Sequence, residues 1–228
     1  MPGKSFPHYP IFLDVENRDV LIVGGGEVCA RKAATLLEHG ARVTVVSPRS
    51  SRAVATLANE GQIRLVERPY EEADLAGRAL VFASTDDPEV NALVARDCRQ
   101  RNIPVNVADL PELCDFTVPA VVERGSIQIA VSTGGKSPAL SRRLRETLQN
   151  VIGPEWSEVN ELLGALRAPA KEALSTDDHR KAFFDSILAA DVAGLIRDGR
   201  REVALERVAA ICRDAGVAFD FSSPSGQG

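Results

Sequence analysis

The sequence predicts an α/β fold, with a parallel sheet in its first half and helices at its end. The first observation is the run Gly24-Gly25-Gly26, which lies between the apolar residues 20–23 and an alanine-rich helical pattern. The second is that short apolar runs alternate with helical patterns as far as residue 107, an order typical of parallel sheets. The third is that the pattern is helical throughout after Gly153. Together these predict a Rossmann-type parallel sheet domain, a strand-plus-helix segment and an all-helical C-terminal domain.

Short apolar runs mark the strands of the expected sheet, at residues 20–23, 42–46, 63–66, 79–83 and 103–107. Helices are expected over residues 28–37, with Gly40 as a C-terminal cap, over 50–60 and over 89–101. The apolar segment 9–13 precedes the sheet as an edge strand or a packed arm, and a simple cover over the core is the favoured interpretation.

Beyond residue 113 the pattern changes. Residues 116–122 and 126–131 are strand-like and joined by the turn 123–125, which predicts an antiparallel hairpin. Ser137 and Pro138 then suit the N-cap and first position of a helix. Further helices are expected over 155–166, 181–190 and 202–215, separated by loops at 168–169, 175–178 and 197–199. Residues 221–228 have the composition of a disordered tail.

Composition narrows the class of protein. The chain has 228 residues, 44% hydrophobic and 26% charged, with a net charge of -5, which is typical of a globular protein and argues against a nucleic-acid partner. No apolar run approaches the roughly 18 residues that a membrane span needs, and no signal peptide is evident. We therefore expect a cytoplasmic protein without a membrane partner. Its four cysteines form no CxxC pair, so reduced thiols and no metal site are expected.

The glycine run is the candidate cofactor site. Gly24 would permit a tight turn and Gly26 a close approach of the backbone to a pyrophosphate, which the N–H groups of a helix N-terminus stabilise. Cys29 occupies the place of the third small residue of the dinucleotide fingerprint. The second strand is followed by Ser47-Pro48-Arg49, without the acidic residue that would bond a ribose, so the residues leave NAD and NADP both open. The expected cofactor contacts here are Gly24, Gly25, Gly26, Glu27, Val28, Ser47 and Pro48.

Polar residues follow the fourth and fifth strands, at the edge where such sheets bind ligands. Thr85, Asp86 and Asn91 are further candidate cofactor contacts. An alternative is that Asp86 or Asp87 only caps the next helix, and Asn91 has the same two interpretations. The fifth strand brings Asp109 to the same edge.

The expected helix after Pro138 carries two kinds of side chain. Leu140, Leu144 and Leu148 share one face, while Arg142, Arg143 and Arg145 lie off it. The arginines form either a solvated face or a cationic rim for a polyanionic ligand.

In their order, these motifs resemble those of the precorrin-2 dehydrogenase family, which also forms the N-terminal half of siroheme synthase and is often paired with sirohydrochlorin ferrochelatase activity. The resemblance covers about two thirds of the chain. It is carried by Tyr9-Pro10-Ile11-Phe12-Leu13, Val23-Gly24-Gly25-Gly26-Glu27-Val28-Cys29-Ala30-Arg31-Lys32, Ala83-Ser84-Thr85-Asp86-Asp87, Val105-Asn106-Val107-Ala108-Asp109, Phe116, Pro119 and 130–138.

The resemblance implies NAD-dependent oxidation of precorrin-2 to sirohydrochlorin by a homodimer. It implies a Rossmann domain over residues 1–113, a dimerisation segment over 114–150 and a helical domain over 151–228. Asp109 matches the family's functional aspartate, and a carboxylate there can accept the proton that oxidation releases. Because precorrin-2 is a polycarboxylate, cations are needed to bind it. The expected substrate contacts are Thr133, Gly134, Lys136, Arg142 and Arg145, with Arg124 and Arg143 as further nearby cations.

A second activity, insertion of Fe²⁺ or Co²⁺ into sirohydrochlorin, stays open. The histidines His8, His39 and His179 are not clustered, so the metal would bind only transiently. Two other functions stay open as well: a Rossmann oxidoreductase acting on a small alcohol or ketone, and a non-catalytic NAD-sensing module.

Overall fold

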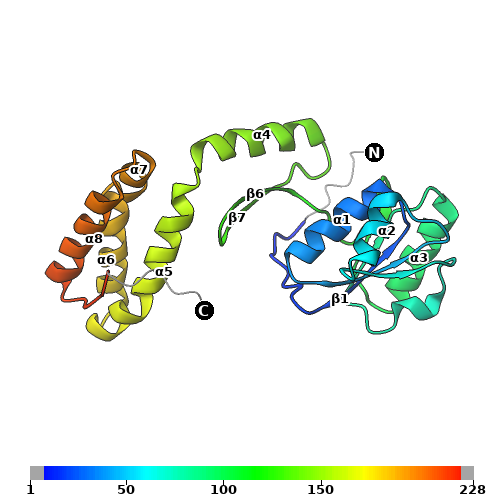
Figure 1. Cartoon of the computed structure of the whole chain (residues 1–228), viewed down its shortest axis with the longest axis horizontal. Coiled ribbons are helices and arrows are strands. Elements are labelled where there is room, and N and C mark those ends of the chain that lie inside the picture. The colour runs from blue at the N-terminus through cyan, green and yellow to red at the C-terminus, as the bar shows by residue number, and fades with distance from the viewer. Residues whose placement is uncertain (1–7, 222–228) are drawn as a thin grey trace. The chain divides into compact units, whose positions relative to one another are not determined.

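The computed structural model describes residues 8–221 (Figure 1). Contacts between Cα atoms divide the chain into two compact units, Met1–Val118 and Pro119–Gly228. The expected tail at 221–228 lies outside the described residues, apart from Phe221. The division into three domains stays a prediction.

The first unit is built on a parallel sheet of five strands: β1 (Asp19–Val23), β2 (Arg42–Val46), β3 (Arg64–Val66), β4 (Leu80–Ala83) and β5 (Val105–Val107). Their order is β3-β2-β1-β4-β5. Val23 pairs with Val46 on one side and with Ala83 on the other, so the three strands end at one level. The strand order reverses between β1 and β4, which is where sheets of this kind bind ligands.

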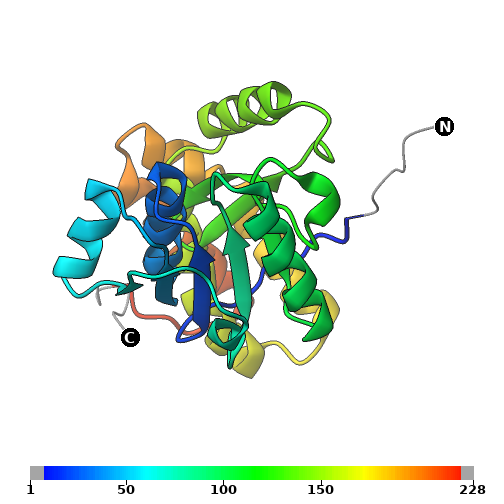
Figure 2. The same cartoon turned by 90° about the vertical axis from the view of Figure 1, so that its right-hand side faces the viewer.

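Helices cover both faces of this sheet (Figure 2). On one face, α1 (Glu27–Glu38) and α2 (Arg52–Asn59) pack over a core that includes Ile22 and Phe82. On the other face, α3 (Pro88–Gln100) packs with Leu21 and Val81. Two short 3₁₀ helices, η1 (Glu72–Leu75) and η2 (Pro111–Leu113), complete the unit. The expected Rossmann-type fold is thus confirmed.

The N-terminal arm does not cover the core. Residues 8–15 form no strand, and Tyr9, Ile11, Phe12 and Leu13 are exposed, Tyr9 by 86%. The favoured interpretation was therefore wrong for this chain. Helices α1 and α2 already cover that core, and of this segment only Val15 packs against it.

The second unit opens with an antiparallel hairpin of β6 (Ala120–Arg124) and β7 (Ile127–Val131), against which α4 (Pro138–Val151) packs. The expected turn at 123–125 was wrong in its position, because Glu123 and Arg124 pair with Gln128 and Ile127. The turn is made by Gly125 and Ser126. Gly125 has a φ of +57°, and a Cβ there would lie 2.0 Å from Ser157 Oγ.

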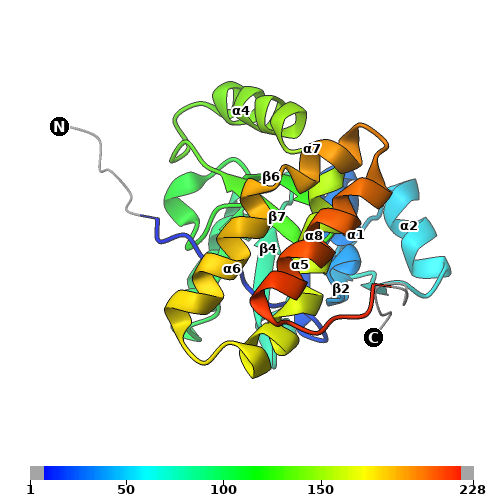
Figure 3. The same cartoon turned by 90° about the vertical axis from the view of Figure 1, so that its left-hand side faces the viewer.

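Four helices form the rest of the unit: α5 (Glu155–Ala173), α6 (Asp177–Ala189), α7 (Val192–Arg197) and α8 (Arg201–Ala215). Figure 3 shows α5, α6 and α8 packed side by side. The predicted break at 168–169 was wrong, since α5 continues through Pro169. Its neighbours Leu166 and Ala170 are fully buried in the helical core, and this packing outweighs the hydrogen bond that a proline cannot donate. Helix α7 was not predicted.

Candidate functional site

The glycine turn after β1 packs too tightly to carry side chains at its first two positions. Gly24 has a φ of +120°, and a Cβ there would lie 2.5 Å from the Ser84 carbonyl oxygen. A Cβ on Gly25 would lie 2.1 Å from the Arg49 carbonyl oxygen. Gly26 differs, because its backbone is extended and a Cβ would meet nothing within 4 Å. The first two glycines are therefore required by the protein itself, whereas Gly26 borders open space.

Helix α1 begins beside that space without a side-chain cap. Gly26 is the N-cap, and no side chain among residues 8–221 caps the first N–H groups of the helix. Such groups together with the helix dipole form an anion site. Glu27 and Val28 are exposed there, Val28 by 39%, although it is apolar. Both residues therefore remain candidate cofactor contacts. The buried face of α1 starts at Cys29.

Ser84, directly after β4, supplies an unsatisfied polar atom next to Gly24. Its Oγ is buried and has no hydrogen-bond partner within the described part of the chain. A buried hydroxyl without a partner is uncommon and calls for an explanation. The open Gly26, the uncapped helix and the Ser84 hydroxyl together fit the phosphates and hydroxyls of a dinucleotide.

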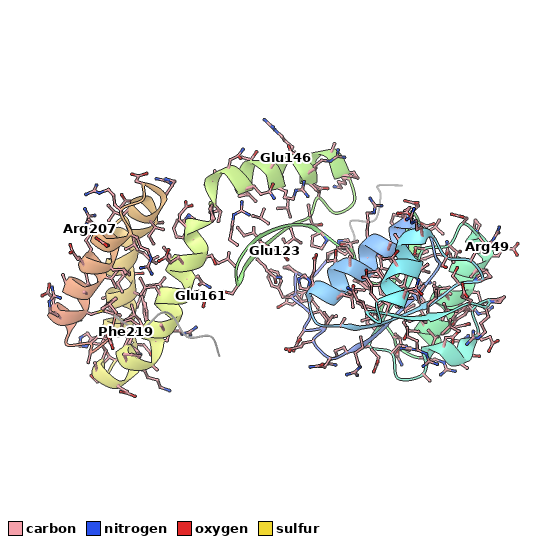
Figure 4. All side chains as sticks on the ribbon, in the orientation of Figure 1. Arg49, Glu123, Glu146, Glu161, Arg207 and Phe219 are labelled. Atoms are coloured by element: carbon pink, nitrogen blue, oxygen red, sulfur yellow. The ribbon has the colours of Figure 1, made fainter. Side chains whose placement is uncertain are left out.

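The loop after β2 packs against the glycine turn. Ser47 is buried, and its Oγ donates to the Arg49 carbonyl over 2.6 Å. The Ser51 N–H donates to the Gly25 carbonyl over 2.7 Å. Pro48 and Arg49 are exposed, and Arg49 points outward from the first unit (Figure 4). The Ser47 hydroxyl thus forms a hydrogen bond within its own loop. Any contact between this loop and a cofactor would come from Pro48, Arg49 or the backbone.

After β4, Asn91 supports Thr85. The Asn91 Oδ1 atom accepts from the Thr85 N–H over 3.2 Å and from its hydroxyl over 2.9 Å, and Nδ2 donates to the Thr85 carbonyl over 3.0 Å. Asp87 is the N-cap of α3 and accepts from the Glu89 N–H over 2.9 Å. Asp87, not Asn91, caps the helix, and the Asn91 side chain instead shapes the Thr85 loop. Asp86 is exposed.

Asp109 lies in a turn two residues beyond β5. It is exposed and has a φ of +60°, a left-handed conformation that is uncommon outside glycine. The Ala108 N–H donates to the Ala83 carbonyl over 2.8 Å, which fastens the start of the turn to β4. Cys114 Sγ accepts from the Val107 N–H over 3.1 Å. Asp109 and the glycine turn thus follow the carboxyl ends of strands in one sheet, at the same edge.

Lys32 was not among the predicted site residues, yet it lies near this turn. Its Nζ donates to Asn106 Oδ1 over 3.2 Å and is 4.6 Å from the ring centroid of Phe82. Burial lowers the pKa of Lys32, and Asp109 is among the charges that oppose this shift. The polar Asn106 within an otherwise apolar strand is a sequence signal for a buried polar contact, but it does not identify Lys32 as the partner.

The predicted substrate contacts of the second unit differ in whether their side chains are exposed or already hydrogen-bonded within the protein. Thr133 Oγ1 accepts from the Ser137 N–H over 3.2 Å and donates to its carbonyl over 3.1 Å, so it shapes its own loop. Gly134 and Lys136 are exposed in that loop, and Arg142 is exposed on α4. Arg145 is half-buried, and its Nε is buried without a partner in the described part of the chain.

Arg124 has a structural role. Its Nε donates to the Ile152 carbonyl over 2.9 Å and one of its terminal nitrogens to the Gln149 carbonyl over 3.1 Å. These carbonyls lie at the end of α4, where a cation is favoured. Arg124 is therefore less available for a substrate than Lys136 or Arg142.

No three His, Cys, Asp or Glu side chains among residues 8–221 lie close enough together to hold a metal ion. No helix in this range is both long and apolar enough to cross a membrane.

The fold and this site define the class of dinucleotide-binding α/β proteins. Comparison with family models agrees, since an NAD(P)-binding model matches residues 11–120 and the model "Sirohaem biosynthesis protein central" matches residues 124–150. The chain is thus similar to siroheme synthases and precorrin-2 dehydrogenases, as the motifs had indicated. The NAD(P)-binding model supports NAD as the cofactor of the first unit.

Individual relatives agree with this assignment. The chain is 40% identical over 195 residues to a siroheme synthase of Methylobacillus flagellatus and 41% identical over 208 residues to one of Methylococcus capsulatus. These matches cover 86% and 91% of this chain but only 42% and 44% of the relatives. The solved structure of SirC, precorrin-2 dehydrogenase, matches with a TM-score of 0.66 and 25% identity, over 92% of this chain and 99% of SirC.

Proposed function

We propose that this chain catalyses the NAD-dependent dehydrogenation of precorrin-2 to sirohydrochlorin. The observation that carries the proposal is that a dinucleotide-type turn and the Asp109 carboxylate lie at one edge of the sheet. The likeness to SirC, a precorrin-2 dehydrogenase, over 99% of that chain supports the choice of substrate. The siroheme synthases it resembles support the pathway.

The first unit supplies the residues for cofactor binding. The N–H groups at the start of α1 and the Ser84 hydroxyl would hold the pyrophosphate and its neighbouring hydroxyls. Asn91 keeps Thr85 in place near them. When bound, NAD supplies the acceptor for a hydride.

Asp109 is the proposed base. Oxidation of precorrin-2 removes one hydrogen with its electron pair and another as a proton, and the Asp109 carboxylate accepts this proton. Because Asp109 is exposed, it can pass the proton to water and return to the carboxylate form.

The second unit supplies cations and a surface for a second copy of the chain. Lys136 and Arg142 are the exposed cations proposed to bind substrate carboxylates, with Thr133, Gly134 and Arg145 as the remaining candidates. On α4, Leu140 and Leu144 are 49% and 41% exposed, so the leucine stripe is not buried within this chain. An exposed apolar stripe on a helix is suited to an interface, and we assign it to a homodimer. A cytoplasmic location remains a prediction.

The assay that tests the proposal supplies the purified protein with NAD and with precorrin-2 made in a coupled reaction. The expected result is the absorbance of sirohydrochlorin and NADH formation that depends on the tetrapyrrole. NADH formation with small alcohols but not with precorrin-2 would favour the small-substrate oxidoreductase instead. NAD binding without any turnover would favour the sensing module.

Metal insertion is the second candidate function, supported by the siroheme synthase name of the relatives. Fe²⁺ or Co²⁺ would be a transient substrate, and Asp109 would take the pyrrole protons that the metal displaces. Adding either ion to purified sirohydrochlorin, with and without the protein, tests this. Equal rates in both samples would exclude a chelatase activity.

A further inference from the structure

Lys32 is linked to the Asp109 turn by a continuous series of contacts. Its ammonium group is hydrogen-bonded to Asn106 Oδ1 over 3.2 Å and lies against the face of Phe82. Phe82 contacts Phe116 edge-on, with 5.5 Å between the ring centroids. The half-buried ammonium group of α1 thus reaches across to β4 and β5.

Asn106, which accepts the hydrogen bond from Lys32, also contacts the segment that follows the Asp109 turn. Its Nδ2 donates to the Phe116 carbonyl over 3.0 Å and approaches Cys114 Sγ at 3.6 Å. The Cys114 thiol is 3.2 Å from the Val107 carbonyl and 3.4 Å from the Leu110 carbonyl. Val107 and Leu110 bracket Asp109, so Cys114 closes the turn in which Asp109 adopts its left-handed conformation.

The pKa of Lys32 depends on some of the same residues. Burial is the main cause that lowers the pKa of Lys32, and the Arg31 charge on the same helix lowers it further. Cys114 and Asp109, from the segment after β5, act in the opposite direction, and the Phe82 ring of β4 lies against the ammonium group. A half-buried ammonium group is costly unless it is paired. The hydrogen bond to Asn106, the Phe82 ring, and the electrostatic effects of Cys114 and, less strongly, Asp109 offset this cost.

We infer that Lys32 is a positioning residue of the dehydrogenation, which holds the Asp109 turn in place through Asn106 and Cys114. The inference rests on the proposed function, because it gives Asp109 the role of base. Lys32 needs no contact with substrate or cofactor for this role. A purely structural lysine would tie α1 to β5 without any effect on the step at Asp109.

The test compares Lys32→Met with Lys32→Arg and with the control Arg31→Met, which removes an exposed cation from the same helix. Lys32→Met is expected to lower kcat by about tenfold or more, because small displacements of a catalytic group have effects of that size. NAD affinity should change little. Lys32→Arg should recover part of the rate, and Arg31→Met should resemble the wild type.

The pH dependence gives a readout that a structural role would not alter. Because the pKa of Lys32 is lowered, the wild-type kcat should fall on the alkaline side at a lower pH than an ordinary lysine would give. In Lys32→Arg this fall should move to higher pH, since arginine stays protonated. An unchanged alkaline fall in Lys32→Arg, or a Lys32→Met loss confined to NAD affinity and thermal stability, would overturn the inference.

Hydrogen exchange keeps the test separate from the proposed function. Lys32→Met should speed amide exchange in peptides that cover residues 105–115, whereas Arg31→Met should not. This measurement needs no turnover. If the wild type fails to oxidise precorrin-2, the proposed function fails, and the exchange result still decides whether Lys32 holds the turn. Equal exchange in the two variants would show that it does not.

Discussion

Gly24 and Ser84 lie so close that the glycine has no room for a side chain: its missing Cβ would be 2.5 Å from the Ser84 carbonyl oxygen. This contact joins the turn after β1 to the end of β4, at the point where the strand order reverses. It also leaves the Ser84 hydroxyl buried without a partner in the described residues. A close backbone contact and an unsatisfied buried hydroxyl thus lie side by side at the cofactor turn.

Substitution of Gly24 is therefore expected to damage the fold before it affects cofactor binding. In Gly24→Ala, the left-handed backbone alone costs about 1–3 kcal/mol, and the contact with Ser84 adds to this. The free energy of unfolding, measured with a denaturant, should fall clearly. Wild-type stability in Gly24→Ala would show that the turn is less tight than described.

Gly26 is the better position at which to test cofactor binding. It has a φ of -81°, which any residue adopts, and open space where a Cβ would lie. Gly26→Asp should fold normally but raise the NAD dissociation constant by about tenfold or more, a loss of about 1.4 kcal/mol, because a negative charge faces the phosphates. Calorimetric NAD titration measures this, with Gly26→Ala as the uncharged control. Equal affinity in Gly26→Asp and the wild type would remove the glycine turn from the cofactor site.

Much of the first unit could be predicted because its signals are local. Each strand is a short apolar run, and the glycine run marks the first strand-to-helix turn. Asp87 followed by Pro88 marks the start of α3. The second unit was predicted less well, because its boundaries depend on packing. Pro169 stays within α5 since Leu166 and Ala170 are buried beside it, and α7 is too short for periodicity to reveal.

The residues of the candidate site also fall into two groups: those that local sequence signals predict and those that depend on tertiary contacts. Gly24 was predicted from its position in the dinucleotide fingerprint, and Asp109 from its position just after the fifth strand. The Lys32 to Asn106 hydrogen bond joins residues 74 positions apart, which no local pattern records. Nor could the sequence show that Asn91 and Thr133 use their side chains to shape their own loops, because an asparagine or threonine looks the same in either role.

Asp109 is best tested with asparagine. Its φ of +60° penalises alanine, whereas asparagine tolerates the left-handed region. Asp109→Asn should therefore keep stability and NAD affinity while it lowers kcat by about 10²–10⁴-fold, the range for loss of a general base. Steady-state kinetics with precorrin-2 checks the rate, and Asp109→Gly provides a second unstrained variant. Near wild-type turnover in both variants would exclude Asp109 as the base.

The exposed leucines of α4 predict the oligomeric state. Leu144 is 41% exposed, and Leu140 lies one turn before it on the same helix. In a homodimer formed on this stripe, Leu144→Arg places a charge within an apolar interface, where it is costly. Sedimentation should show a dimer for the wild type and a monomer for Leu144→Arg. The matched control is Arg142→Leu, which changes an exposed residue of the same helix off the leucine stripe and should leave the dimer intact. A monomeric wild type, or a Leu144→Arg protein that stays dimeric, would contradict the assignment of this stripe to a second copy of the chain.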